Sequence, residues 1–360
     1  MTTYLLYMAS PAILYVLVEA FAKKQITKNL RTKKTYLILV GICMTLMIGL
    51  RAYTNGSGDT RYYFNLWEYF SKMTFAEFVV YSPKLDMEFG YKVTTWVLSQ
   101  FFADGQWLLF LSGAFISVSV CCFVYKNCEN PVLALMVFNC LGLFNFMVQG
   151  LRQAIAMCIC LWALELCKNR NLVKFVLLVV LASLFHASAL VFLPVFFIRF
   201  KKMDVKSLFL FSVLIAIVLA FLPTFFEIIN IAINDSYTLD EGSSSGGIVA
   251  ILIYLAIIAF ALLAYNSEDQ EHALFVCMAV VGLMCMILRR TTNGIVERIS
   301  FFYAFSQMVL VSNSVQRVSS SNGNSKIAFN LLIFALCFGV AVYKTTYSIL
   351  IPYLFCWQVA

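Results

Sequence analysis

The chain has 360 residues, of which 62% are hydrophobic and only 12% are charged, and its mean hydropathy is +0.87. Soluble domains carry about 25% charged residues, so this composition excludes a soluble globular protein. The net charge of +8 would suit nucleic-acid binding, but the basic residues gather in short loops between apolar runs. This pattern indicates a polytopic membrane protein that binds no nucleic acid.

Apolar runs long enough to cross a bilayer recur along the whole chain. A spanning helix needs roughly 20 apolar residues, and continuous runs favour helices over the alternating pattern of barrel strands. We expect an all-α fold, with one polytopic membrane domain over residues 1–360 and about twelve transmembrane helices. The expected spans are 4–22, 34–50, 106–125, 131–148, 151–167, 172–186, 188–199, 207–225, 247–265, 272–288, 298–313 and 327–344.

The first basic loop predicts the orientation of these spans. Residues 23–34 read KKQITKNLRTKK, which is typical of a cytoplasmic loop under the positive-inside rule. Later basic loops then also fall inside, provided that Phe89–Ala103 does not cross, so we expect this segment to be re-entrant or interfacial. The runs 172–186 and 188–199 are short, and we expect a hairpin of short helices that meet near His186.

Two loops are expected on the outer side. The first covers residues 51–105 and contains an amphipathic helix whose apolar face would lie in the membrane interface. That face is formed by Tyr63, Leu66, Trp67, Phe70 and Met73. The second loop, 226–247, is acidic and rich in Ser and Gly, which is typical of a mobile segment.

Arginines gather on the predicted outer side. They are Arg51, Arg61, Arg152, Arg289, Arg290 and Arg298, and all except Arg61 lie at the mouth of a helix. An unpaired arginine at bilayer depth costs roughly 3 kcal/mol or more. One such residue could simply reach the headgroups, but five on the side that is usually poor in basic residues favour an anionic ligand. Because the guanidinium fork fits phosphate oxygens, we predict a phosphate or pyrophosphate group just outside the membrane.

Three further residues could act on a hydroxyl group. His186, in ASLFHASAL, is either a packed imidazole bonded to a neighbouring carbonyl or serine, or a general base for a sugar hydroxyl. Asp59, in NGSGDTRYY, could cap the helix that follows, bind the acceptor sugar, or act as the base. Glu88 is a weaker candidate of the same kind, whereas His272 lies in an acidic loop and is expected to be solvated surface.

Motifs for nucleotide or metal chemistry are missing from the sequence. It contains no GxGxxG, Walker A, HExxH or paired CxxC pattern. The 12 cysteines fall mainly inside apolar runs, without ligand spacing, so we interpret them as small hydrophobic residues. We expect no metal and no other cofactor.

Taken together, several blocks resemble the EpsG family of membrane proteins, which is related to the Wzy polymerases of bacterial surface polysaccharides. These blocks are GLRAYTNGSGDTRYYF from Gly49, EFGY from Glu88, GLRQAIAM from Gly150, LASLFHASAL from Leu181, RISFFY from Arg298 and IPY from Ile351. They follow one another in order from residue 49 to residue 353, so the resemblance covers most of the chain.

The resemblance implies a GT-C-like glycosyltransferase in the bacterial cytoplasmic membrane, with its active site facing outside. Proteins of this kind join polyprenyl-pyrophosphate-linked repeat units in capsule, exopolysaccharide or O-antigen synthesis. They move the growing chain from one carrier lipid onto the free sugar end of the next unit. The implied partners are the lipid-linked oligosaccharide donor and acceptor, membrane lipids, a chain-length regulator and a flippase.

Within this interpretation the catalytic residues would be His186, Asp59 and Arg152. We expect His186 to act as base or pyrophosphate partner, and Asp59 to hold the acceptor. The substrate-binding residues would be Arg51, Arg61, Glu88, Gln153, Arg289, Arg290 and Arg298. Two alternatives stay open: an O-antigen ligase-like enzyme with the same donor, and a transporter or flippase of the lipid-linked oligosaccharide. An acyltransferase would need its histidine on the cytoplasmic side, which disfavours that reading.

Overall fold

The computed structural model describes residues 2–53, 58–198, 206–217, 221, 247–264, 269–289, 294–318, 323–346 and 353–358. This part of the chain is all-α, as expected, and its β pairing is an isolated bridge between Arg51 and Phe355. The chain divides into two compact units, one comprising Met1–Leu193 with Asn324–Ala360, and the other Pro194–Gly323.

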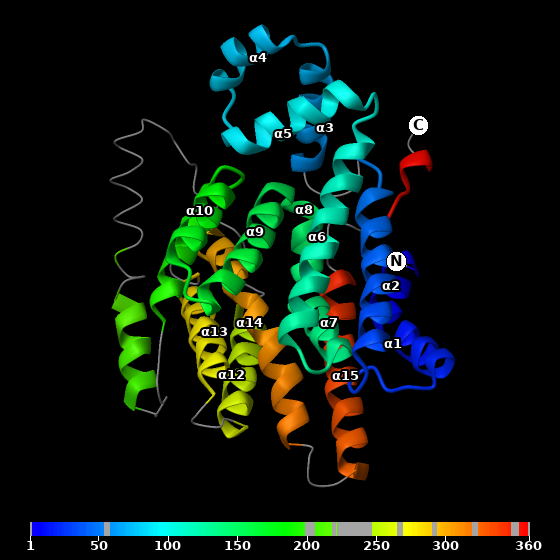
Figure 1. Ribbon diagram of the computed structural model, residues 1–360, viewed down its shortest axis with the longest axis vertical. Coiled ribbons are helices and arrows are strands. Elements are labelled where there is room, and N and C mark those ends of the chain that lie inside the picture. The colour runs from blue at the N-terminus through cyan, green and yellow to red at the C-terminus, as the bar shows by residue number, and fades with distance from the viewer. Residues whose placement is uncertain are drawn as a thin grey trace. The chain divides into compact units, whose positions relative to one another are not determined.

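The first unit holds the helices that run from the N-terminus to the middle of the chain, together with the last long helix (Figure 1). Its elements are α1 (Thr2–Ala22), α2 (Leu30–Gly49), α3 (Gly58–Ser71), α4 (Phe75–Tyr81), η1 (Ser82–Lys84), α5 (Phe89–Phe101), α6 (Gln106–Asn127), α7 (Pro131–Cys140), α8 (Leu143–Gln149), α9 (Leu151–Lys168), α10 (Leu172–Ser183) and α15 (Gly323–Thr346). A 3₁₀ segment, η2 (Ala187–Phe197), continues from it, and η4 (Cys356–Gln358) lies near the C-terminus.

The second unit contains fewer described elements. They are an apolar helix over Lys206–Ile217, then α12 (Gly247–Leu263), α13 (Gln270–Leu288) and α14 (Gly294–Val318). The predicted external loop 226–247 lies outside the described residues, except for Gly247, where α12 begins.

Four described helices are long and apolar enough to cross a membrane, namely α1, α2, α6 and α13, and the bent pair α7 and α8 could form a fifth span. These elements match the predicted runs 4–22, 34–50, 106–125, 272–288 and 131–148. The last run is broken by a 61° bend at Gly142, whose φ of +76° suits glycine. The other predicted runs form shorter or more charged helices where they are described. These long apolar helices indicate a multi-pass membrane protein.

Close helix packing holds the first unit together. α2 packs against α1 and α6, and α9 packs against α6 and α10. At Gly49 an added Cβ would lie 2.5 Å from a ring carbon of Phe110 and 2.9 Å from its Cα. Small residues allow such backbone approach between membrane helices, so the glycine of the GLR block sets the contact between α2 and α6.

The helices α3, α4 and α5 form a lobe beyond the C-terminal end of α2 (Figure 1). The predicted apolar face of α3 exists, but it does not rest on the membrane. Its residues Tyr63, Leu66, Trp67 and Phe70 are buried in protein, as is Met73, which follows the helix. α5 packs against α3, and the rings of Phe70 and Phe78 meet edge to face at 5.3 Å. The hydrophobic face therefore packs against protein. Sequence periodicity alone cannot distinguish such a face from one that contacts lipid.

α5 itself is 13 residues long, which at 1.5 Å per residue is about 20 Å and too short for a hydrocarbon core of about 30 Å. The turn at His186 also forms where it was expected, between α10 and η2. The rings of Phe175 and Phe192 lie 6.3 Å apart, so the chain doubles back there. The second arm of this hairpin is a 3₁₀ segment rather than an α-helix.

Candidate functional site

The start of α5 lies directly against the turn after α10. The amide of Gly90 donates to the carbonyl of Leu184 at 2.8 Å. A Cβ at Gly90 would lie 2.8 Å from that oxygen and 2.9 Å from the Leu184 Cβ, closer than real Cβ contacts allow. The glycine of the EFGY block thus permits the approach that brings Glu88 to His186.

Glu88 joins three segments of the first unit. It is the N-cap residue of α5. Its Oε1 lies 2.8 Å from Nδ1 of His186, and its Oε2 accepts a hydrogen bond from Nη1 of Arg152 at 2.5 Å. Arg152 is the second residue of α9, and His186 follows α10. One carboxylate therefore binds the two residues that the sequence singled out for pyrophosphate binding and proton transfer.

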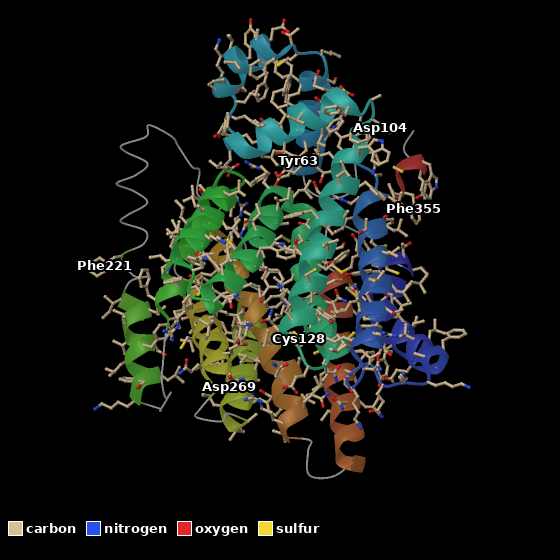
Figure 2. The ribbon with its side chains drawn as sticks, viewed as in Figure 1. Tyr63, Asp104, Cys128, Phe221, Asp269 and Phe355 are labelled. Atoms are coloured by element: carbon tan, nitrogen blue, oxygen red, sulfur yellow. The ribbon has the colours of Figure 1, made fainter. Side chains whose placement is uncertain are left out.

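Tyr63, on α3, also contacts Arg152. Together with Glu88, Arg152 and His186 it forms a cluster of four side chains. Nε of Arg152 donates to its hydroxyl at 3.3 Å, and the guanidinium carbon lies 5.9 Å from the ring centre. The ring also packs against Tyr91, with centroids 5.1 Å apart. Figure 2 shows Tyr63 where the α3–α5 lobe meets the helices below it. The buried rings of Tyr63 and Tyr91 thus hold one face of the Arg152 guanidinium in place.

The cluster is partly buried and keeps polar atoms available. The side chains of Glu88, His186 and Arg152 are 16%, 18% and 25% exposed. Within the described residues, neither Nη2 of Arg152 nor Nε2 of His186 has a protein hydrogen-bond partner. Arg152 also lies in the first turn of α9, where the helix end carries partial positive charge. The arrangement can bind an anion beside a proton acceptor.

The charge state of Glu88 follows from its neighbours. Burial raises its pKa, but the hydrogen bond from His186 and the positive charge of Arg152 outweigh burial and lower the pKa from 4.5 to about 2. Glu88 is therefore a carboxylate at neutral pH. Lys92 holds the chain that leads to it, because its Nζ donates to the carbonyls of Ser82 and Leu85 at 2.8 and 3.1 Å.

Arg51 is fully buried, with 0% of its surface exposed. Its Nη2 donates to Thr60 Oγ1 at 3.0 Å and to the carbonyl of Val148 at 2.6 Å. Burial lowers its pKa to about 10, while Tyr4 and Tyr353 act in the opposite direction, so it remains charged at neutral pH. The structure thus gives Arg51 protein ligands: it ties the start of α3 to the end of α8.

The C-terminal segment covers this arginine. The amide of Ala52 donates to the carbonyl of Leu354 at 2.8 Å, and the amide of Cys356 donates to the carbonyl of Leu50 at 2.9 Å. The hydroxyl of Tyr353 also donates to the carbonyl of Met47 at 3.1 Å. Figure 2 shows Phe355 beside the end of α2. Residues 47–52 and 353–356, far apart in the sequence, therefore meet through two backbone hydrogen bonds and the Tyr353 hydroxyl.

The structure also describes the other predicted site residues of the first unit. Asp59 is exposed in the first turn of α3, where an acidic residue suits the helix dipole. It lies one turn before Tyr63, and its charge contributes to the raised pKa of that phenol, although burial is the main cause. Arg61 is exposed, whereas Gln153 is buried next to Arg152.

Three predicted arginines belong to the second unit. Arg289 follows α13 and pairs with Glu297 at 2.8 Å. Arg298 is exposed near the start of α14, and Arg290 lies outside the described residues. Their expected role in binding substrate stays a prediction.

His272 differs from its expected place on the solvated surface. It is 3% exposed, because the first turn of α13 packs against α12, and its Nε2 contacts the carbonyl of Ala261 at 3.1 Å. A carbonyl only accepts hydrogen bonds, so Nε2 carries a proton. The acidic residues around His272 in the sequence favoured an exposed loop, so the prediction of a solvated surface was wrong.

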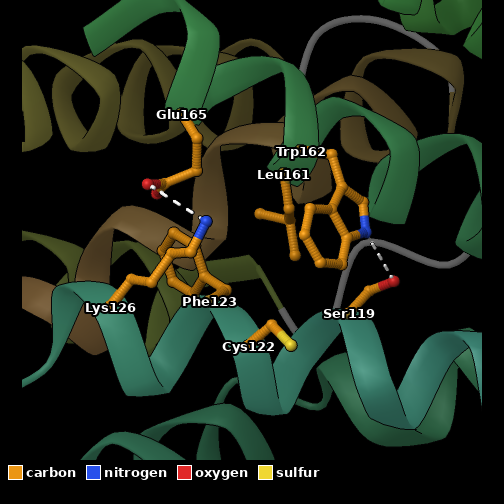
Figure 3. A pocket seen from close by; sticks show the side chains of 7 residues that line it. All are labelled: Ser119, Cys122, Phe123, Lys126, Leu161, Trp162 and Glu165. Carbon is orange, nitrogen blue, oxygen red and sulfur yellow. Dashed lines mark hydrogen bonds and ion pairs between the residues drawn. The ribbon is translucent and has the colours of Figure 1, made fainter. Parts of the chain in front are cut away.

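A small cavity between α6 and α9 does not resemble a substrate site (Figure 3). Its volume is about 10 Å³, near the lower limit for one water molecule. Lys126 and Glu165 pair across it at 3.7 Å, and Trp162 Nε1 donates to Ser119 Oγ at 3.0 Å. These contacts tie α6 to α9 and leave no room for a sugar.

Comparison with protein families decides the classification. The model of the EpsG family matches residues 34–355. The chain belongs to the EpsG family. All six sequence blocks between Gly49 and Tyr353 fall inside the matched EpsG region. No curated protein and no solved structure is significantly similar to the chain.

Sequence reasoning on this EpsG chain missed part of the cluster. Tyr63 was assigned to an apolar surface, although it lies one helical turn after Asp59, which could have indicated a shared face. Glu88 was considered as a weaker alternative to Asp59. Its link to Arg152 and His186 spans 64 and 98 positions, and no local pattern signals contacts of that range.

Proposed function

We propose that this EpsG-family protein is a polysaccharide polymerase of the bacterial cytoplasmic membrane. It would join polyprenyl-pyrophosphate-linked oligosaccharide units on the outer side, through a GT-C-like fold of about twelve spans. The observation that carries this proposal is the contact of Glu88 with both Arg152 and His186. An anion-binding fork and an imidazole are thereby brought to one point, which a transfer from a pyrophosphate to a hydroxyl requires.

The proposed reaction gives one role each to His186 and Arg152. A hydroxyl of the acceptor sugar attacks the anomeric carbon of the donor, and the bond from that carbon to the pyrophosphate oxygen breaks. The hydroxyl proton passes to Nε2 of His186, and the polyprenyl pyrophosphate leaves with the bonding electrons. Arg152 stabilises the negative charge that develops on this leaving group.

The surrounding residues have supporting roles in this proposal. Asp59, exposed one turn before Tyr63, would bind hydroxyls of the acceptor sugar. Further contacts to the pyrophosphates and sugars would come from Arg61 and Gln153, while a role of Arg289, Arg290 and Arg298 in binding substrate stays a separate prediction. We assign Arg51 to holding α3 against α8 rather than to the ligand, because its guanidinium donates to Thr60 and Val148 inside the protein.

The test is mass analysis of lipid-linked sugars in cells that lack this protein. A polymerase defect should leave single repeat units, on the carrier lipid and at the cell surface, and the wild-type gene should restore long chains. Genes for His186→Ala and Arg152→Lys should not restore them. Full-length polymer retained on its carrier would indicate a ligase-like enzyme, and absence of any sugar product outside would indicate a flippase. Either of these outcomes would overturn the proposal.

A further inference from the structure

The position of Glu88 suggests a role different from contact with substrate. Both of its carboxylate oxygens are engaged, Oε1 by His186 and Oε2 by Arg152. A carboxylate whose two oxygens are held in this way is poorly placed to accept sugar hydroxyls. Its neighbours, by contrast, keep Nε2 and Nη2 available within the described residues.

We propose that Glu88 is a positioning residue, which fixes His186 in the tautomer with the proton on Nδ1 and holds Arg152 beside it. An ionised carboxylate only accepts hydrogen bonds, so the 2.8 Å contact requires a proton on Nδ1. In the neutral ring Nε2 is then bare and can accept the proton of a hydroxyl. The same carboxylate stabilises the imidazolium after transfer. The inference rests on the proposed function for its catalytic meaning, but the tautomer is a property of the resting protein.

The surroundings of Glu88 are built to keep it in place. Lys92 anchors the preceding turn, and Gly90 hydrogen-bonds to Leu184, two residues before His186. Arg152 is in turn held by Tyr63 at 3.3 Å. The low pKa of Glu88, about 2, agrees with a carboxylate that stays charged at neutral pH. Orientation of an imidazole by a buried carboxylate is a known way to prepare a general base.

Glu88→Gln separates charge from shape. Arginine can only donate hydrogen bonds, so the amide oxygen introduced by this substitution faces Arg152 and its NH₂ group faces His186. Nδ1 must then accept, and the proton moves to Nε2. The substitution therefore inverts the tautomer while it keeps the size of the side chain.

Nitrogen-15 NMR of protein labelled only at histidine, in lipid bilayers and at alkaline pH, measures this directly. The chain has two histidines, and the spectrum of His186→Gln, which retains His272 alone, assigns them. We expect Nδ1–H for His186 in the wild type, opposite to the Nε2–H form of His272, and Nε2–H for His186 in Glu88→Gln. Asp86→Asn, which removes an exposed carboxylate two residues away, should keep the wild-type form. An Nε2–H ring at His186 in the wild type, or no inversion in Glu88→Gln, would overturn the proposal.

A kinetic measurement adds a second criterion. In a purified assay with lipid-linked repeat units, Glu88→Gln and His186→Ala should each lower kcat by about 100-fold or more, and the double variant should be no slower than either. Additive losses would exclude action of Glu88 through His186. The wild-type spectrum tests the tautomer even if Glu88→Gln fails to fold. It also keeps its meaning if the polymerase assignment is wrong, since no substrate is needed.

Discussion

The amide of Gly90 donates to the carbonyl oxygen of Leu184 at 2.8 Å, and a Cβ on Gly90 would lie only 2.8 Å from the same oxygen. This contact joins the N-terminus of α5 to the end of α10 and so sets the distance between Glu88 and His186. The EFGY and LASLFHASAL blocks are therefore in direct contact in the folded protein, although almost a hundred residues separate them in the sequence.

Gly90→Ala should disturb the candidate site through the backbone. Forcing a methyl group into this contact costs about 1–3 kcal/mol, so we expect a lower melting temperature in detergent and a loss of polymer length in cells. Gly339→Ala is the matched control, since a Cβ there meets no atom within 4 Å. Equal melting temperatures for wild type and Gly90→Ala would contradict the close approach.

Arg152→Lys tests the fork of the guanidinium. Lysine keeps the charge, but one ammonium cannot hold Glu88 and Tyr63 and also bind phosphate in a bidentate way. We expect turnover to fall by about 100-fold or more, corresponding to about 3 kcal/mol of transition-state stabilisation, while the protein stays inserted. Arg170→Lys, in the exposed turn that follows α9, is the control. Normal polymer length in Arg152→Lys would leave this residue with only the structural role of its contacts to Glu88 and Tyr63.

Arg51→Lys should act on stability rather than on substrate affinity. The lysine can replace only one of the two hydrogen bonds that the buried guanidinium donates to Thr60 and Val148. A hydrogen bond of a charged group contributes about 2 kcal/mol to the free energy of unfolding. We expect a lower melting temperature and lower abundance in the membrane, with little change in KM for the protein that remains. An unchanged melting temperature together with a raised KM would instead make Arg51 a ligand of the substrate.

The stability of the protein should depend on the charge of Glu88. Its pKa in the folded protein, about 2, lies below the ordinary value of 4.5, so the carboxylate stabilises the fold at neutral pH by on the order of 3 kcal/mol. This contribution is lost progressively as the pH falls from about 4.5 toward 2. The melting temperature, measured at several pH values between about 7 and 3, should therefore decrease more steeply for the wild type than for Glu88→Gln as the pH falls. Parallel curves would show that Glu88 is not held as described.

Thiol labelling tests the predicted orientation. Single cysteines at Thr27, before α2, and at Ser71, at the end of α3, both replace exposed residues. An impermeant reagent should label Ser71→Cys in intact cells and Thr27→Cys only after permeabilisation, in a background without native reactive cysteines. The reverse pattern would place the cluster of Glu88, Arg152 and His186 on the cytoplasmic side.

Features of the site that depend on local pattern could be predicted from the sequence. Long apolar runs gave α1, α2, α6 and α13, because span length and hydropathy are properties of consecutive residues. The break at His186 followed from the shortness of its two arms. Which groups meet could not be predicted, since the partners of Glu88 and the cover over α3 are set by packing between segments far apart in the chain.

Burial was the least predictable property. Arg51 and His272 both stand in polar surroundings in the sequence, yet both are enclosed by protein. For Arg51 the enclosing groups include Thr60, Val148 and the segment around Tyr353. A charged residue at a helix mouth can bind a ligand or hold the protein together, and the sequence alone does not distinguish the two.

The pairing of residues 50–52 with residues 354–356 also bears on how the protein is made. Tyr353 and Met47 are 306 positions apart, and a ribosome adding about 5–20 residues per second needs on the order of tens of seconds to cover that distance. During this time the segment around Arg51 lacks its contacts with residues 353–356. Residues 353–356 are synthesised long after those around Arg51, and they complete the packing of this early part of the chain. A chain that lacks them would insert its helices and still leave Arg51 without this cover.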